Sequence, residues 1–205
     1  GTLAAMIQSH KLARKAGIKC LTACEIYEVD DDEWRSDTKE YSQPRYHLLL
    51  IAKNNVGLHN LIQIVSYANT DGFYKKPRID INRIKSNGWG EGLICCTACQ
   101  AGRLSKYLTQ KMEEEAWKYA DDLCGTFDNV YCEIQSHNTP EQAKANRLIY
   151  DFAIENDLPY VITTDAHMIR KEDMKYHSMF VEAIGHREVG EAYIDCYMQT
   201  RSEEH

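Results

Sequence analysis

Short apolar runs alternate along the chain with stretches in which apolar residues recur every three or four positions. Continuous runs such as YHLLLIA at residues 46–52 are typical of buried strands, whereas the wider spacing is typical of amphipathic helices. Strands are therefore predicted at residues 18–29, 46–52, 92–97, 130–135 and 160–164. Helices are predicted at residues 1–17, 55–67, 81–84, 104–123, 140–155 and 172–184.

Local signals mark several of the expected boundaries. Gly17 is a stop for the first helix, and Thr139 followed by Pro140 is an N-cap with a first-turn proline. The acidic residues 30–40 are expected to form a solvated loop. Strands that alternate with crossover helices imply a parallel sheet, and this number of units favours one α/β domain over residues 1–205, a barrel of the (β/α) type. Ligand-binding groups of such a barrel lie just past the carboxyl ends of its strands.

Composition narrows the class of protein. With 43% hydrophobic residues, 27% charged residues and only 4 prolines, the chain is typical of a folded globular protein. The net charge of −7 argues against a general nucleic-acid coat, which would need a basic face. An acidic excess is compatible with a pocket whose carboxylates are neutralised by divalent cations.

The cysteines and the absence of targeting signals indicate the compartment. The 8 cysteines of this 205-residue chain do not resemble a disulfide scaffold and are interpreted as reduced thiols. No signal peptide begins the sequence, and no apolar run is long enough to span a membrane. We therefore expect a cytoplasmic protein with no membrane partner.

The segment Thr164-Asp165-Ala166-His167 directly follows an apolar run and is the strongest local signal for chemistry. Alternate residues of an extended chain point the same way, so Asp165 and His167 are expected to lie together. A carboxylate and an imidazole in this arrangement can share one divalent cation. The alternative is an aspartate that caps a turn beside a surface histidine.

Three more candidate ligands lie on or beside other predicted strands. Glu25 is inside the apolar run LTACEIY, where a carboxylate needs a cation, a metal or a proton. His47 opens YHLLLIA, and Cys99 ends GLICCTAC as a soft ligand suited to zinc, or to manganese where oxygen ligands dominate. The alternatives are that Glu25 pairs with a lysine, that His47 is a core histidine whose hydrogen bonds are satisfied, and that Cys99 is a small buried hydrophobic residue. The strand ends of a barrel converge on one pocket, so a shared metal site explains these five residues better than five unrelated structural roles do.

Six blocks of sequence, in this order, resemble a known family. GIKCLTACEIY, YHLLLIAKN, GFYKKPRID, GLICCTACQAG, YCEIQSHNTPEQAKAN and LPYVITTDAHMI are similar to the PHP (polymerase and histidinol phosphatase) domain of bacterial DNA polymerase III alpha subunits. The resemblance covers nearly the whole chain. The order and spacing of the blocks are more specific than any single block, and GFYKKPRID separates the chain from stand-alone histidinol phosphatases.

The resemblance implies a distorted (β/α)7 TIM-like barrel that binds up to three divalent ions, zinc or manganese, at its strand ends. The family's metal ligands correspond to Glu25, His47, Cys99, Asp165 and His167. Among these, Glu25, Asp165 and His167 are expected to carry catalysis. His137 matches a further family histidine, for which ligation and a contact to a ligand or the substrate are both open.

The front of the chain departs from the family pattern. The family begins with a strand carrying His-x-His, continues to an aspartate and has a second strand that ends in Thr-Asp-His-Gly, and none of these is present. Four expected ligands and the first two strands are therefore missing from this sequence. We expect the 205-residue chain alone to be nearly inactive.

The implied activity is metal-dependent phosphoester hydrolysis, as a 3′–5′ exonuclease or phosphatase, within a replicative DNA-directed DNA polymerase. Lys76 and Arg78 are candidates to hold a phosphate, and the alternative for both is a solvated or structurally paired loop. The implied partners are the rest of the alpha subunit, a DNA 3′ end or nucleotide phosphate, and a proofreading exonuclease subunit. The rival functions are a catalytically inactive scaffold that stabilises the polymerase or docks that exonuclease, and a stand-alone histidinol-phosphatase-like enzyme.

Overall fold

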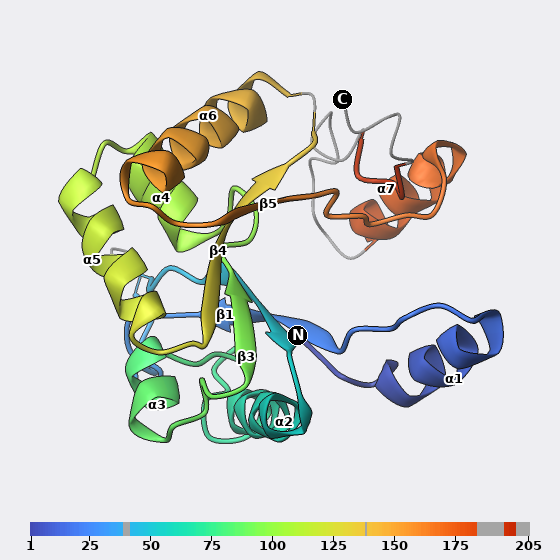
Figure 1. The fold of residues 1–205 in the computed structure, drawn as a ribbon, viewed down its shortest axis with the longest axis horizontal. Helices are drawn as coiled ribbons and strands as arrows, with labels where there is room; N and C mark the ends of the chain where they lie inside the picture. Colours follow the sequence, from blue (N-terminus) through green and yellow to red (C-terminus); the bar gives the residue numbers. More distant parts are fainter. Residues whose placement is uncertain (39–41, 138, 184–194, 200–205) are drawn as a thin grey trace. The chain divides into compact units, whose positions relative to one another are not determined.

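The structure is a computed structural model that describes residues 1–38, 42–137, 139–183 and 195–199. The chain divides into two compact units, residues 1–131 and residues 132–205. Strands and helices occur in both units, so the α/β class predicted from the sequence is confirmed (Figure 1). No helix in the described part of the chain is both long enough and apolar enough to cross a membrane.

The first unit is built on a sheet of three complete strands, β1 (Ala23–Glu28), β2 (Tyr46–Ala52) and β3 (Leu93–Cys96). The first residues of β4 (Asn129–Gln135) pair with β3 in parallel. Strand β2 is antiparallel to both β1 and β3. The helices of this unit are α1 (Met6–Ala16), α2 (Asn55–Asn69), α3 (Ile81–Ser86), α4 (Arg103–Thr109) and α5 (Glu113–Cys124).

The prediction of an all-parallel sheet is wrong for β1, β2 and β3. Between β1 and β2 the described residues contain no helix, so the chain turns back directly and the strands run in opposite directions. The connection from β2 to β3 contains α2 and α3, yet Ala52 pairs with Leu93, so β3 starts at the end of the sheet where β2 finishes. A close approach supports this return, since a Cβ on Gly57 would lie 1.8 Å from the carbonyl oxygen of Gly92.

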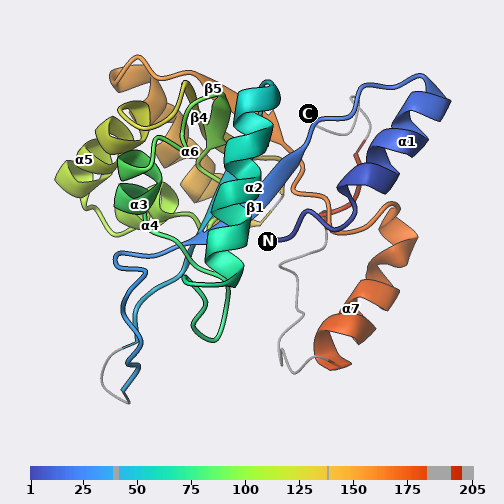
Figure 2. The same cartoon turned by 90° about the horizontal axis from the view of Figure 1, so that it is seen from below.

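The core of the first unit lies on one face of its sheet. Buried side chains alternate along the strands, with Cys24 and Ile26 from β1 and Leu48 and Leu50 from β2 on the same side. Helix α2 packs against this sheet and lies across it (Figure 2). The alternate positions of β1 and β2 are exposed or half-buried, so polar side chains can gather on the other face.

The single long helix predicted at residues 104–123 is instead two helices, α4 and α5. Lys111 adopts a left-handed backbone with φ of 62°. The amide of Met112 donates to the carbonyl of Tyr107, and the amide of Lys111 donates to that of Leu108, which together form a Schellman ending. Glycine usually takes this position, and lysine takes it here, so no local signal predicts the end of α4.

The second unit contains the last residues of β4, which pair in parallel with β5 (Tyr160–Thr163). Its helices are α6 (Pro140–Glu155) and α7 (Met174–Ala183), with the 3₁₀ turn η1 (Lys171–Asp173) before α7. The predicted start of α6 is confirmed, because Oγ1 of Thr139 accepts the amide of Gln142 at 3.2 Å. Residue 184, the predicted end of the last helix, lies outside the described residues.

Candidate metal centre

Glu25, His47 and Cys99 come together on the open face of the first unit's sheet. One ligand atom from each lies within 4.8 Å of those from the other two. Nδ1 of His47 is 3.0 Å from Oε1 of Glu25 and 3.4 Å from Sγ of Cys99. Three of the five ligands predicted from the sequence therefore form one group.

The register of β1 and β2 explains the first two members of this group. Glu25 is directly opposite Leu49, and His47 is directly opposite Tyr27, so Glu25 and His47 are diagonal neighbours on one face. Both side chains are partly accessible, at 42% for Glu25 and 27% for His47. The apolar run around Glu25 suggested a buried carboxylate, and this is wrong because its face of the sheet is open.

Cys99 reaches the same place through a tight loop after β3. The amide of His47 donates to the carbonyl of Ala101 at 3.1 Å, which joins this loop to β2. The amide of Gly102 donates to the carbonyl of Cys99 at 2.7 Å, and the amide of Ala101 points to the Cys99 sulfur at 3.4 Å. A Cβ on Gly102 would lie 2.2 Å from the carbonyl oxygen of Thr97, so the loop closes this tightly only around glycine.

The group is charged in the metal-free state. The hydrogen bond with Cys99 and then that with Glu25 raise the pKa of His47 to about 10. At neutral pH the imidazole therefore holds a proton between a carboxylate and a thiol. A divalent cation would have to displace that proton to take its place.

The donor set fits a divalent transition metal. One carboxylate oxygen, one imidazole nitrogen and one thiolate sulfur form a mixed set that suits zinc, and three protein ligands leave a position for water or substrate. The amide of Ala101 near the sulfur can stabilise a thiolate. Glu25, His47 and Cys99 are thus the residues of the first unit that would hold the ion.

The remaining predicted ligands belong to the second unit. Asp165 follows β5 with a left-handed φ of 43°, and its carboxylate is 3.9 Å from Nδ1 of His167. The same nitrogen is 2.7 Å from the backbone carbonyl of Asp165. The two residues are neighbours as predicted, although the backbone at Asp165 is left-handed and not the extended chain on which that prediction rested. That they converge with the first three ligands stays a prediction.

His137 also lies in the second unit and contacts a cysteine that the sequence did not single out. Its Nε2 is 2.9 Å from the carbonyl oxygen of Thr164 and 3.4 Å from Sγ of the buried Cys196. The sequence offered no signal for this contact, because Cys196 lies far along the chain and outside every quoted block. In contrast, Tyr27, the residue opposite His47, could have been singled out from the sequence, because it lies two residues after Glu25 on the same strand face.

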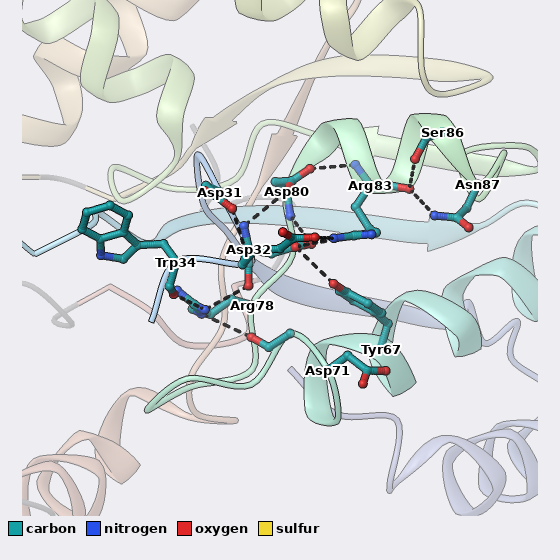
Figure 3. A network of polar contacts seen from close by, with 12 residues as sticks. Asp31, Asp32, Trp34, Tyr67, Asp71, Arg78, Asp80, Arg83, Ser86 and Asn87 are labelled. Carbon is teal, nitrogen blue, oxygen red and sulfur yellow. Dashed lines mark hydrogen bonds and ion pairs between the residues drawn. The ribbon is translucent and has the colours of Figure 1, made fainter. Parts of the chain in front are cut away.

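A second group of acidic residues, Asp31, Asp32 and Asp80, has a structural explanation. Asp32 is fully buried, and its carboxylate accepts hydrogen bonds from Tyr67 and from two nitrogens of Arg83 (Figure 3). Asp80 caps α3 by accepting the amide of Arg83 at 2.7 Å. These carboxylates are already paired with a cation and with backbone donors, so the group carries no metal proposal.

The same network contains Arg78, one of the two candidate phosphate contacts. Its side chain is 1% exposed, and its guanidinium donates to the carbonyls of Gly72, Asp32 and Trp34 (Figure 3). A guanidinium surrounded by backbone acceptors ties loops together, so the structurally paired alternative is favoured for Arg78. Lys76 is exposed, and its role as a phosphate contact stays a prediction.

Comparison with known proteins identifies the family of this chain. The model of the family described as PHP domain matches residues 1–137. The chain belongs to the PHP domain family. The match includes Glu25, His47 and Cys99, the group that the structure brings together, and it ends before Asp165.

Curated relatives of this PHP domain are named DNA polymerase III subunit alpha. The chain is 34% identical over 88% of its length to the DNA polymerase III subunit alpha of Aquifex aeolicus (strain VF5), covering 16% of that protein. It is 32% identical over 84% of its length to that of Treponema pallidum (strain Nichols), and 31% identical over 88% to that of Thermus aquaticus, covering 15% of each. The chain thus spans about 15% of the length of these curated relatives.

Proposed function

We propose that this PHP domain is the metal-dependent phosphoesterase part of a bacterial DNA polymerase III alpha subunit. The observation that carries the proposal is the Glu25, His47 and Cys99 group, whose ligand atoms lie within 4.8 Å of one another on the open face of a sheet. Relatives named DNA polymerase III subunit alpha supply the replication context. The proposed reaction is hydrolysis of a phosphoester at a DNA 3′ end, or of a nucleotide phosphate.

Each residue has a distinct part in this proposal. A bound zinc or manganese ion would supply an activated water and charge neutralisation at phosphorus. Glu25, His47 and Cys99 hold that ion, and the Cys99 loop keeps the sulfur in place through the amide of Ala101. Asp165 and His167 complete the ligand set, with His137 beside them. Lys76 supplies local positive charge for the phosphate in a chain whose net charge is −7.

The wider architecture is part of the same proposal. The described strands pair in the order β1-β2-β3-β4-β5. We propose that the two units belong to a single domain and that additional strands complete a (β/α)7 barrel in the polymerase subunit. Its partners would be the rest of that subunit, DNA and a proofreading exonuclease, in the cytoplasm.

A scaffold function is the second candidate, and one observation favours it. His47 already lies within hydrogen-bonding distance of Glu25 and Cys99, so the group is satisfied by a proton without any metal. A PHP domain of this kind could stabilise the polymerase or dock an exonuclease without hydrolysing anything. The stand-alone phosphatase has no such support.

The decisive experiment compares these functions in the complete polymerase subunit that we propose carries this chain. Release of nucleotides from a 3′-labelled DNA strand is measured with manganese or zinc, for the wild type and for Cys99→Ser and His167→Ala. The matched control is Glu114→Gln, which removes an exposed carboxylate whose partner is Lys118. The proposal expects metal-dependent release that both site variants abolish and the control retains. Full metal loading without any hydrolysis, together with tight binding of a proofreading exonuclease, would establish the scaffold instead.

A further inference from the structure

Tyr27 is the direct cross-strand partner of His47. The two residues face each other in the antiparallel pair of β1 and β2. Their ring centroids are 5.3 Å apart, and the ring planes are tilted by 55°. This separation is within the range at which aromatic rings attract each other through packing and quadrupole contacts.

The contact matters because few other interactions restrain the imidazole of His47. Its backbone amide is fixed to Ala101, but that bond leaves the side-chain torsions free. The Nδ1 atom is aimed at Glu25 and Cys99, and both of these interactions would change when a cation replaces the proton between them. The contact with the ring of Tyr27 involves neither Glu25 nor Cys99.

The positions of Glu25 and Tyr27 on β1 also indicate that Tyr27 restrains the imidazole of His47. Glu25 and Tyr27 are two residues apart on β1, so their side chains leave the same face of the sheet. Glu25 therefore approaches the imidazole of His47 from one strand position, and Tyr27 from the next. Tyr27 is half-buried.

We propose that Tyr27 is a positioning residue that holds the imidazole of His47 aimed at the shared ligand position of Glu25 and Cys99. The inference rests on the metal-binding function proposed above. The aromatic ring, and not the hydroxyl, positions the imidazole, because the contact with His47 is made between the two rings. Removing the ring allows the imidazole to sample other rotamers, and metal binding must then restrict it again.

The test compares Tyr27→Leu, which removes the ring, with Tyr27→Phe, which removes only the hydroxyl. Zinc affinity of the 205-residue chain is measured by competition with a chromophoric chelator, and cobalt absorption reports the ligand geometry. We expect Tyr27→Leu to bind zinc about three- to tenfold more weakly, from the usual energy of an aromatic pair, and Tyr27→Phe to match the wild type. Equal loss in both variants, or no loss in Tyr27→Leu, overturns the proposal.

The matched control is Tyr107→Leu. Tyr107 is also half-buried in the first unit, and its ring contacts Tyr119 at a centroid distance of 6.2 Å, away from the candidate ligands. This variant is expected to lose stability in urea while keeping its zinc affinity. If it loses zinc affinity as strongly as Tyr27→Leu, general loosening of the unit explains the result and the positioning role is wrong.

A crystal structure of each metal-free Tyr27 variant separates this proposal from the metal function. We expect the 3.0 Å contact between His47 and Glu25 to persist in Tyr27→Phe and to be lost in Tyr27→Leu. If wild-type chain binds no zinc but these distances behave as expected, the metal function fails and the positioning role stands. If zinc binds and the imidazole stays in place without the ring, the positioning role fails alone.

Discussion

Nδ1 of His47 lies 3.0 Å from Oε1 of Glu25, and the sulfur of Cys99 is 3.4 Å from the same nitrogen. A single imidazole nitrogen is thus shared by a carboxylate from one strand and a thiol from a loop. The proton on that imidazole occupies the place that we assign to a cation. The group can therefore exchange one positive charge for another, and this exchange governs its dependence on pH.

Zinc affinity should increase as the pH rises toward 10. The neighbours of His47 raise its pKa from 6.5 to about 10, so the protein must release a proton to bind metal anywhere below that value. Each proton that His47 and the Cys99 thiol release on binding corresponds to about a tenfold loss of affinity for each unit of pH decrease. Calorimetry in buffers with different ionisation enthalpies measures the released protons directly. An affinity that does not change between pH 7 and 9 would contradict this assignment.

Replacing Asp165 with asparagine should lower the metal content of the chain after dialysis. Asp165 and His167 lie together in the second unit, and the prediction is that they share an ion with the first unit's ligands or hold one of their own. With these ligands the chain is expected to retain at most one or two ions. Elemental analysis compares Asp165→Asn with the control Asp151→Asn, an exposed carboxylate paired with Arg147. The same metal content in both variants would remove Asp165 from the site.

Local sequence signals were sufficient for most of the elements and for part of the site. The apolar run at 46–52 matches β2, and Thr139 with Pro140 marks the start of α6. Asp165 also lies beside His167 as predicted, although the backbone at Asp165 is left-handed and not extended. The direction of β3 could not be predicted in this way, because the connection from β2 contains α2 and α3 and still returns to an antiparallel pairing. The burial of Arg78 was likewise hidden, since its acceptors are carbonyls from distant loops.

Replacing Arg78 with lysine should destabilise the first unit without affecting phosphate chemistry. Lysine cannot reproduce the planar set of donors that reaches the carbonyls of Gly72, Asp32 and Trp34. Buried acceptors would lose their partners, at about 1–3 kcal/mol each. Urea denaturation measures the loss, with Lys76→Ala as the exposed control that should unfold like the wild type. An unchanged midpoint for Arg78→Lys would show that these bonds contribute little.

The buried Glu28 should make the stability of the chain depend on pH. Burial raises the pKa of Glu28 from 4.5 to about 7, although Arg103 and the hydroxyl of Tyr119 oppose this shift. The folded state then holds the proton more tightly than the unfolded state, so the contribution is fully present below pH 4.5 and is lost as the pH rises through 7. Glu28→Gln keeps an acceptor for Tyr119 and does not titrate. Its free energy of unfolding relative to wild type should therefore rise between these pH values, and a constant difference would place the pKa elsewhere.

Two small substitutions in the loop that contains Cys99 should differ in their effect on zinc affinity. Gly102 has an ordinary φ of −68°, so an alanine at this position would not strain the backbone. Its Cβ would instead clash with the carbonyl oxygen of Thr97, at 2.2 Å. Gly102→Ala must therefore open the loop, at about 1–3 kcal/mol, and move the Cys99 sulfur away from His47.

Ala98 in the same loop provides the matched comparison. Its φ of 60° is left-handed, a conformation that costs an alanine about 1 kcal/mol and a glycine almost nothing. Ala98→Gly relieves that strain but loses a buried methyl group, so its stability should stay within about 1 kcal/mol of the wild type. Because the loop keeps its closure, zinc affinity should be retained in Ala98→Gly and reduced in Gly102→Ala. Chelator competition and urea denaturation on both variants separate the two effects. If Gly102→Ala is less stable yet binds zinc as tightly as the wild type, the loop positions no ligand and Cys99 does not belong to the metal site.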